Sequence, residues 1–456
     1  MLHVVHRPME LTNSPVPDPD QGFLTSPHYL RAKDRCLKMM DRLDETGLFG
    51  RLDREVQFNV LAINLSSWIR SQSPEALVMA EAPHSHAQYL AYEICRYLEI
   101  PVYRFHTWTP IPVLFLQEMN SGLIYRPQSR GPEDVFSRLS DELEVFLSRI
   151  LGSQGALDFE PEYMRRQRRQ SRLVSRILRA LRSAPRRVAS ETYHHWKAKG
   201  AYNPLNPARF GLLGRAALKR KRRANLSRAC KSSKTRAPIP ERFVLFALHY
   251  EPERTTNPDG MNFHDQLVAL ACLREAVPAS VAILVKEHPS QLFGTNKGVR
   301  GRSPLFYRAI NAMDNVFFLG SEGDMRRLIT ESELVATITG NVAVETALLG
   351  RKALVFGHTW FHGCPNVSHW SDLTSYLSLM EAVAEPPERV AAFFRSRLKE
   401  ICIPGHQNRS TQQRFANFGD EHFDEVQTTV IGDLMENVLT RGLSAQERWV
   451  EGVPAE

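Results

Sequence analysis

Three polar segments, each placed directly after a short apolar run, carry most of the residues that could do chemistry in this chain. They are His249-Tyr-Glu-Pro-Glu-Arg-Thr-Thr256, Lys286-Glu-His-Pro289 and Thr339-Gly-Asn341. Apolar runs of this length predict buried strands, and the carboxyl ends of parallel strands meet at one edge of a sheet. The sequence therefore predicts a ligand crevice at that edge, suited to a phosphate-bearing substrate.

The segment that follows Leu248 is the densest polar cluster, with two carboxylates, an imidazole and a guanidinium close together. Glycosyl transfer needs a carboxylate or an imidazole to deprotonate the acceptor or to meet the anomeric carbon, and an arginine can hold an anionic group. A solvated loop capped by Thr255 and Asp259 is the alternative. The candidate catalytic residues are His249, Glu251, Glu253 and Arg254.

The other two segments suit a phosphate group. Gly340 lies between a strand and a helix, where it allows close backbone approach and leaves free N–H groups at the helix start. An ordinary turn in which Asn341 caps the helix is the alternative. His288 can donate a hydrogen bond to a phosphate oxygen, and Pro289 fixes the turn that projects its ring. The candidate phosphate-binding residues are Lys286, His288, Thr339, Gly340 and Asn341.

A fourth polar segment, His358-Thr-Trp-Phe-His362-Gly-Cys364, also follows an apolar run. We expect no metal site here, because the segment reads as a loop and no fourth ligand is evident. The candidate contacts to a base or sugar are Glu345, His358 and Trp360, with the tryptophan stacking on the ring. Glu81 and His84 are candidates for the acceptor side, although a capped helix start explains them as well.

The elements that must position these residues fall into two groups. A chain of 456 residues, 43% of them hydrophobic, exceeds what one core normally serves, so two domains are expected. A strand at 76–80, a helix at about 86–98 and a strand at 100–104 predict a βαβ unit and a parallel sheet. Five apolar runs predict a second parallel sheet covered on both faces: 243–248, 281–285, 316–319, 334–338 and 353–356.

These patterns predict an α/β protein with two domains and a basic helical insertion. The expected division has a flexible arm, an N-terminal domain, the insertion with a linker, a C-terminal domain and a terminal segment with a helix. In that order, the expected ranges are 1–28, 29–160, 161–240, 241–410 and 411–456.

The basic insertion dominates the charge pattern. The chain carries a net charge of +8. Residues 165–236 hold 23 Lys and Arg and a single acid, Glu191, so the net charge of this segment is +22. The rest of the chain therefore has a net charge of 8 − 22 = −14. A basic amphipathic helix at 165–187 is expected to dock on the anionic inner-membrane surface. Nucleic-acid binding through this segment is a rival interpretation, disfavoured by its few aromatic residues and by the acidic remainder.

The cysteines and the N-terminal residues indicate the cellular compartment in which we expect the protein. None of the six cysteines forms a C-x-x-C pair, which favours a reduced compartment over a disulfide framework. No secretory signal and no apolar stretch of about 18 residues is present. We expect a cytoplasmic protein, peripheral at the inner membrane.

At these motifs the sequence resembles the bacterial capsule polysaccharide biosynthesis family, whose better-known members resemble β-Kdo transferases. The resemblance rests on residues 248–256, 285–289 and 339–345. It implies a GT-B glycosyltransferase of capsule or lipopolysaccharide biosynthesis that transfers a sugar, with Kdo from CMP-Kdo as the candidate, to a glycan or lipid-linked acceptor. The GT-B type implies two Rossmann-like domains facing a cleft, with 29–160 as the N-terminal acceptor domain and 241–410 as the C-terminal nucleotide-sugar-binding domain. It also implies a terminal helix within 411–456 that crosses back to the first domain. It further implies that a CMP-sugar phosphate meets His288-Pro289 and Thr339-Gly340, although the turn here lacks the paired hydroxyls of related enzymes.

No cofactor or divalent metal is expected, because Lys, His and a helix start can neutralise the leaving phosphate between them. A nucleotide-sugar epimerase of the UDP-GlcNAc 2-epimerase type shares the two-domain plan and is the rival among enzymes.

Overall fold

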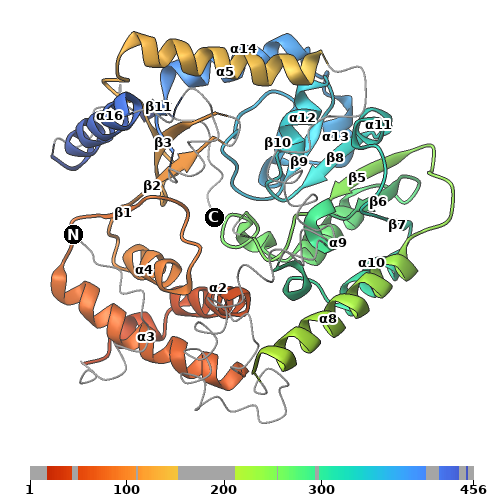
Figure 1. Ribbon diagram of the computed structural model, residues 1–456, viewed down its shortest axis with the longest axis horizontal. Helices are drawn as coiled ribbons and strands as arrows, with labels where there is room; N and C mark the ends of the chain where they lie inside the picture. Colours follow the sequence, from red (N-terminus) through yellow and green to blue (C-terminus); the bar gives the residue numbers. More distant parts are fainter. Residues whose placement is uncertain are drawn as a thin grey trace.

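The computed structural model describes residues 18–43, 50–108, 111–152, 211–253, 255–292, 297–406, 418, 421–440 and 448–449. Within these residues the strands form two six-stranded sheets, one for each half of the chain, with helices around them (Figure 1). The expected α/β class with two sheet-containing domains is confirmed.

The first sheet begins with the predicted βαβ unit. Strands β1 (Leu77–Met79) and β2 (Val102–Thr107) pair in parallel and are joined by α4 (His86–Tyr97), as expected. The remaining strands of this sheet pair antiparallel with their neighbours: β3 (Val113–Glu118), β4 (Ile124–Tyr125), β11 (Ile403–Pro404) and β12 (Arg448–Trp449). The short link from β2 to β3 explains the change, because a parallel pair needs a crossover of a dozen or more residues.

Three helices precede this sheet and pack with α4. They are α1 (Gln21–Leu24), α2 (Pro27–Leu43) and α3 (Arg51–Gln72). Phe23 of α1 is completely buried, and the Asp20 side chain caps α1 by accepting from the Phe23 N–H at 3.1 Å. Residues 18–28, which the sequence assigns to a flexible arm, are therefore part of the packed helical layer.

The second sheet is parallel throughout, in the order β10-β9-β8-β5-β6-β7. Read from β7, this is the doubly wound order 3-2-1-4-5-6. All five predicted strands are present, and a sixth follows them. Their bounds are β5 (Phe243–Ala247), β6 (Ala282–Lys286), β7 (Val316–Gly320), β8 (Leu334–Thr337), β9 (Ala353–Val355) and β10 (Val367–His369).

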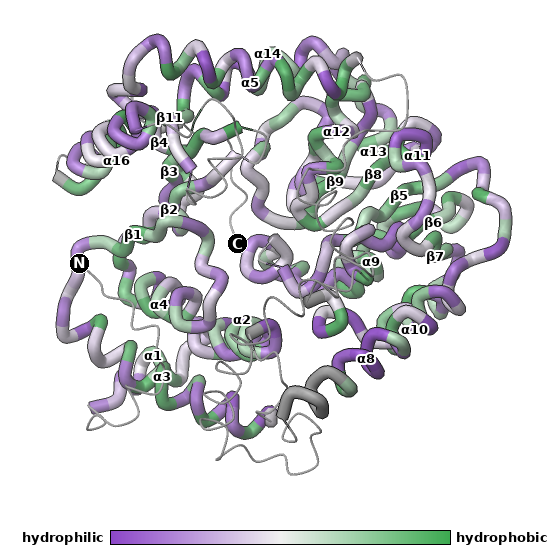
Figure 2. The backbone as a smooth tube through the Cα atoms, in the orientation of Figure 1, coloured by the Kyte–Doolittle hydropathy of each residue, from purple (hydrophilic) through white to green (hydrophobic). Residues whose placement is uncertain are grey.

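Both faces of the second sheet are covered, which is why its strands are continuous apolar runs (Figure 2). Val244 and Phe246 of β5 enter one core cluster, whereas Phe243 and Leu245 enter another on the opposite face, since successive side chains of a strand alternate. The helices around this sheet are α9 (Gln266–Ala276), α10 (Pro304–Asn311), α11 (Met325–Glu331), α12 (Val342–Leu348) and α13 (Tyr376–Glu381). Short 3-10 turns complete it: η4 (Met261–Phe263), η5 (Pro289–Leu292), η6 (Lys297–Arg300) and η7 (Trp370–Asp372).

Helix α8 (Gly211–Ser233) belongs to this second domain, although the sequence analysis places it in the insertion. Leu226 and Cys230 are buried in the core on the α10 side of the sheet, while Lys221, Arg228 and Lys231 are exposed. Segment 165–187, the predicted basic amphipathic helix, lies outside the described residues. None of the described helices is long and apolar enough to span a membrane.

One hydrophobic core joins the two halves of the molecule. It contains strands of the first sheet, α12 and β9 of the second domain, and three helices placed across the top and side of Figure 1. These helices are α5 (Glu133–Leu151), α14 (Pro387–Glu400) and α16 (Glu421–Thr440). Helix α16 lies against the first sheet, where Gln427 Oε1 accepts from the His406 N–H at 3.1 Å.

Candidate functional site

The carboxyl ends of β5, β6 and β8 lie next to one another, so the structure brings the three polar segments to one place. From β5 the chain adds β6 and β7 on one side of the sheet and then β8, β9 and β10 on the other side. The strand order therefore reverses between β5 and β8, which makes this boundary the switch point of the sheet. Ligands of open α/β sheets bind in the crevice outside the strand ends at such a point. The loop after β5 and the turn after β8 begin here.

His249 ties the β5 loop to the β8 turn. Its Nε2 accepts a hydrogen bond from the Thr339 N–H at 3.0 Å, and its Nδ1 lies 3.3 Å from Thr255 Oγ1. Burial lowers the pKa of His249 to about 3, with smaller contributions from His288 and Arg302, so the ring is neutral at pH 7. Both ring nitrogens are engaged by the chain, which makes His249 a residue that positions the turn instead of a free base.

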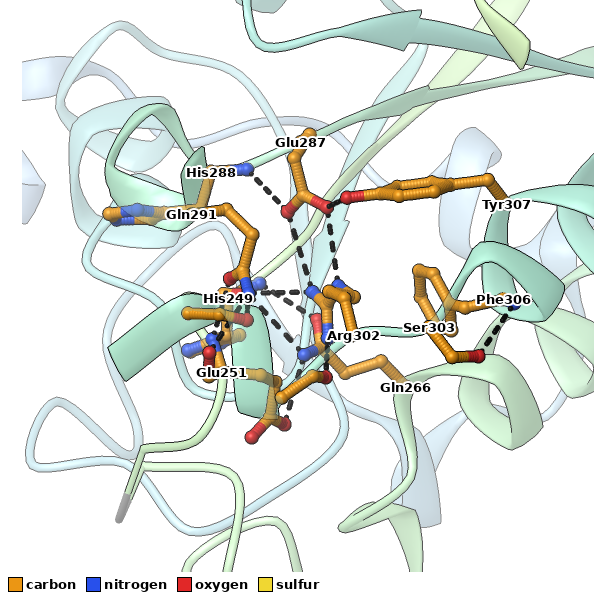
Figure 3. Close-up of polar contacts among 12 residues, drawn as sticks. His249, Glu251, Gln266, Glu287, His288, Gln291, Arg302, Ser303, Phe306 and Tyr307 are labelled. Atoms are coloured by element: carbon orange, nitrogen blue, oxygen red, sulfur yellow. Dashed lines mark hydrogen bonds and ion pairs between the residues drawn. The ribbon is translucent and has the colours of Figure 1, made fainter. Parts of the chain in front are cut away.

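A buried ion pair that the sequence did not single out, Glu287 with Arg302, lies next to His249 (Figure 3). Arg302 Nε lies 3.2 Å from Glu287 Oε2, and both side chains are almost completely buried. Glu287 also accepts from the Tyr307 hydroxyl at 2.8 Å and from the His288 N–H at 2.8 Å. Arg302 Nη2 donates to the His249 carbonyl at 2.8 Å, so the pair connects the ends of β5 and β6.

Glu251 is held inside its own loop. Its Oε1 accepts from Gln266 Nε2 at 3.0 Å and its Oε2 from the Glu253 N–H at 3.3 Å, and the residue is 5% exposed. Gln291 fixes the loop from the other side, donating to the Glu251 carbonyl at 2.9 Å. Glu253 is only partly buried. Of the two predicted catalytic carboxylates, Glu253 is thus the less buried, and Arg254 lies outside the described residues.

The turn after β8 offers backbone donors. Thr339 is used by the chain, since its Oγ1 donates to the Thr255 carbonyl at 2.6 Å in addition to the bond from its N–H to His249. The N–H groups of Gly340 and Asn341 have no acceptor among the described residues. A Cβ at Gly340 would lie 2.8 Å from Thr337 Oγ1 and 3.5 Å from His249 Nε2, so the turn requires glycine for close approach.

His288 has the geometry of a neutral hydrogen-bond donor. Its Nδ1 accepts from the Ser290 N–H at 3.2 Å, which places the proton on Nε2. Burial, with smaller contributions from Arg302 and Lys286, lowers the pKa of His288 to about 4. In Figure 3 the ring points away from the Glu287–Arg302 pair, while its backbone N–H is bound to that pair.

The structure does not bring the Lys286 ammonium to the turn. Its Nζ donates to the Ser321 carbonyl at 3.0 Å. Ser321 directly follows β7, and β7 lies on the side of β6 that faces away from β5. Burial lowers the pKa of Lys286 to about 8, while Glu287 and Glu322 oppose this shift. This lysine therefore secures the outer edge of the sheet.

The three residues predicted to contact a base or sugar, Glu345, His358 and Trp360, have different surroundings. Glu345 follows Asn341 by one helical turn, and desolvation raises its pKa to about 8. His358 is neutral, because burial lowers its pKa to about 3. Trp360 does not agree with the expected stacking role: its ring packs against Trp108, with centroids 5.1 Å apart, and its Nε1 donates to Asn341 Oδ1 at 3.0 Å. Trp360 thus positions Asn341.

Contacts from the first domain reach the β5 loop directly. Arg104 on β2, which is 3% exposed, forms an ion pair with Asp259 at 2.8 Å. The backbone carbonyl of Asp259 accepts a hydrogen bond from the His358 N–H at 2.9 Å. Asn257 Nδ2 donates to the Arg35 carbonyl of α2 at 3.2 Å. These bonds fix the loop from both domains.

The predicted acceptor-side residues lie at the end of β1. His84 Nδ1 is 3.1 Å from Glu81 Oε1, and both side chains are partly exposed. The capped helix start weighed as the alternative is also present, because Ser85 and Gln88 form a capping box at α4. Arg42 bridges this region to the β5 loop by donating to the His84 carbonyl and to the Asn257 carbonyl.

None of the described His, Cys, Asp and Glu side chains gather into a group of three or more placed to hold a metal ion. His358, His362 and Cys364 follow β9 as a loop with a 3.1 Å backbone bond from the Cys364 N–H to the Phe361 carbonyl.

The sequence matches the model of the family described as capsule polysaccharide biosynthesis protein over residues 155–405, more than half of the chain. The protein therefore belongs to this family, as the motifs predict. Membership assigns it to capsule polysaccharide biosynthesis and supports the expected glycosyltransferase activity. No curated protein matches the chain.

Among solved structures, the chain is similar to two transferases of Thermosulfurimonas dismutans KpsC. The β-Kdo 2,7 transferase has 14% identity over 39% of this chain and 52% of its own, with a TM-score of 0.24. The β-Kdo 2,4 transferase has 12% identity over 69% and 78%, with a TM-score of 0.27. The UDP-GlcNAc 2-epimerase of Methanocaldococcus jannaschii has 11% identity over 82% of each chain, with a TM-score of 0.23. The chain spans about half the length of the first of these structures.

Proposed function

We propose that this protein is a glycosyltransferase of capsule or lipopolysaccharide biosynthesis that moves a sugar from a nucleotide-sugar donor to a glycan or lipid-linked acceptor. CMP-Kdo is the first donor to test. The observation that carries the proposal is the hydrogen bond between His249 and the Thr339 N–H, 3.0 Å long, which fixes the β5 loop and the β8 turn at one switch point.

The donor phosphate is held by neutral donors in this proposal. The N–H groups of Gly340 and Asn341 and the Nε2–H of His288 surround the leaving oxygen and stabilise the charge that develops as the glycosidic bond breaks. These donors are fixed before the reaction, because His249, Trp360 and the Glu287–Arg302 pair hold the segments that carry them. Preorganised donors cost no rearrangement at the transition state.

Glu253 is the proposed general base, which accepts the proton of the acceptor hydroxyl as that oxygen attacks the anomeric carbon. Glu251 shapes the loop that presents it, and Arg254 is the candidate to hold an anionic group of the donor. Glu345 and His358 remain candidate contacts to the base or sugar. Glu81 and His84 form the proposed acceptor side, connected to the loop through Arg42.

Calorimetric titration with CMP, CDP, UDP and GDP tests the donor site. We expect one nucleotide to bind the wild-type protein, and His288→Ala to weaken that binding about tenfold or more, the cost of losing a hydrogen bond of about 1.4 kcal/mol to a phosphate. His422→Ala, which removes an exposed histidine of α16, is the matched control. Equal affinity of the two variants would refute the assignment of His288, and product analysis without acceptor separates a transferase from an epimerase.

We further propose that the basic segment 165–187 docks the enzyme on the anionic inner-membrane surface, each Lys or Arg near the surface adding about 1 kcal/mol. The exposed lysines and arginines of α8 carry the same sign of charge. Deleting 165–187 is expected to release the protein from phosphatidylglycerol vesicles while leaving turnover of a soluble acceptor. Unchanged sedimentation with the vesicles would contradict this docking.

A further inference from the structure

A cavity lies at the amino-terminal edge of the second sheet, opposite the edge that carries the candidate site. Arg242 directly precedes β5, Glu333 precedes β8 and Lys352 precedes β9, and all three residues line this cavity. Helix α13 contributes Tyr376 and Leu377 to another wall. The volume is about 410 Å³, and small-molecule sites measure roughly 300–1,000 Å³. This space, called the α13 cavity below, is therefore large enough for a small ligand.

The lining of the α13 cavity is positively charged. Its charged residues are the cations Arg242, Arg351 and Lys352 and one carboxylate, Glu333, so the net charge is +2. One Glu333 oxygen accepts from Arg242 Nε at 2.6 Å, and the other accepts from the Tyr376 hydroxyl. Although burial raises the pKa of Glu333, these two hydrogen bonds lower it below the ordinary value of a glutamate. Glu333 is thus charged and already bonded, and the surplus positive charge favours an anionic ligand.

Both guanidinium groups of the lining keep N–H donors for a ligand. Arg242 donates through Nε to Glu333, and Arg351 donates through Nη2 to the Ser332 carbonyl at 2.5 Å. The other side-chain nitrogens of these two arginines have no hydrogen-bond acceptor in the described part of the chain. A guanidinium group presents its donors in a planar fork that matches two oxygens of a phosphate. The cavity therefore offers two forks to one phosphate group.

Exposed apolar side chains lie on the α13 side of the cavity. Leu377, which lines it, is 62% exposed, and Val383, directly before the lining residue Ala384, is 93% exposed. Lys352 fixes this segment, because its Nζ donates to two backbone carbonyls near the end of α13, at 2.7 Å each. Aliphatic side chains next to Lys and Arg are the combination that binds anionic amphiphiles. The ligand that fits both features has an anionic head and an apolar chain.

We propose that the α13 cavity binds a phosphate monoester carried on an apolar chain, with the phosphate held by Arg242 and Arg351 and the chain lying along Leu377. A phosphate monoester has roughly 1.5 to 2 negative charges at pH 7, which matches the net charge of the lining. The ligand does not compete with a nucleotide, because the candidate site lies at the carboxyl ends of the same strands. The inference is independent of the proposed function.

Calorimetric titration of the full chain with octyl phosphate tests the inference. Octyl phosphate should bind, whereas octanol and inorganic phosphate, which each lack one half of it, should bind at least about tenfold more weakly. Arg351→Gln should weaken octyl phosphate binding about tenfold, because it removes a charged donor. Leu377→Ser should weaken it several-fold, and since Leu377 is exposed, this variant keeps the test valid if Arg351→Gln does not fold. Arg51→Gln and Leu52→Ser, at exposed positions of α3, are the matched controls.

A second measurement distinguishes a membrane lipid from a soluble amphiphile as the source of the ligand. Phosphatidic acid is a lipid with a phosphate monoester head, so wild type and Arg351→Gln are sedimented with phosphatidic acid vesicles. Weaker sedimentation of the variant supports the proposal with a lipid as the ligand. Equal sedimentation, together with octyl phosphate binding that the variant weakens, supports it with a soluble amphiphile.

Three results would overturn the inference. They are no binding of octyl phosphate, equal affinity of octyl phosphate for the wild type and the folded variants, and competition between octyl phosphate and a nucleotide. The last result would place octyl phosphate in the donor crevice. Failure of CMP, CDP, UDP and GDP to bind would remove the proposed donor site alone and leave the octyl phosphate result standing.

Discussion

Neutralising Glu287 should destabilise this protein far more than neutralising a surface glutamate that has an equally well-formed arginine partner. The Glu287 and Arg302 side chains are 0% and 2% exposed. Removing one partner of a buried pair leaves an unpaired charge in the interior and costs about 3–5 kcal/mol. Glu287→Gln keeps only one of the two oxygens that accept from the Tyr307 hydroxyl and the His288 N–H, so a cost of at least about 3 kcal/mol is expected for this variant.

Glu144 supplies the comparison within the same chain. It makes two bonds to Arg395, at 2.6 and 2.8 Å, yet the two side chains are 49% and 46% exposed. Exposed pairs contribute about 0–1 kcal/mol, so Glu144→Gln should lower the free energy of unfolding by less than about 1 kcal/mol.

Urea unfolding followed by tryptophan fluorescence measures both variants against the wild type. A loss of about 3 kcal/mol is a large part of the roughly 5–15 kcal/mol that folded proteins have, so the midpoint should shift clearly. Glu287→Leu combined with Arg302→Met should recover most of the loss, because it removes both charges. The reasoning is refuted if Glu287→Gln and Glu144→Gln shift the midpoint equally.

Three further outcomes are expected. Gly340→Ala should weaken nucleotide binding about tenfold, because the added Cβ would lie 2.8 Å from Thr337 Oγ1. Calorimetry measures this binding. Gly432→Ala is the control, because a Cβ at Gly432 meets nothing within 4 Å. The pKa of Glu345 is raised to about 8, so the folded state binds a proton that the unfolded state releases, and stability should fall as pH rises from about 4.5 to 8. Glu345→Gln should flatten that dependence in urea titrations, and an unchanged slope would contradict it. The pKa of His358 is lowered to about 3 in the folded state. Below about pH 6.5 the unfolded state therefore binds a proton that the folded state does not. Acidification to pH 5 should lower the free energy of unfolding by about 2 kcal/mol. Thermal unfolding of His358→Gln should lose that part of the acid sensitivity, whereas equal sensitivity would show that the ring is not kept neutral.

The second sheet could be predicted because its strands are buried on both faces. Continuous apolar runs such as residues 243–248 are typical of strands buried on both faces, and parallel pairing follows from the helices between them. Strand β3 was not predicted, although residues 113–116 are apolar, because no helix precedes it and its antiparallel pairing with β2 depends on the short link between them.

The candidate site was predictable in outline only. Polar segments after strands indicated the crevice, but the bond from Thr339 to His249 joins residues 90 positions apart, which no local pattern specifies. Glu287 stood in a recognised motif, yet its partner Arg302 lies in a loop 15 residues later. The position of Glu287, directly after a strand whose residues are all buried, was the available signal, because a charged group is buried there only with a partner.

The core that α5, α14 and α16 share with both sheets limits how this protein can be recombined with a relative. Grafting only residues 241–385 onto the first half of a relative would strip apolar surface from α12 and β9 and leave it in water. A functional chimera must carry α14 and α16 together with the first sheet that they cover. Donor specificity is therefore better transferred by exchanging the loops at the strand ends than by exchanging whole domains.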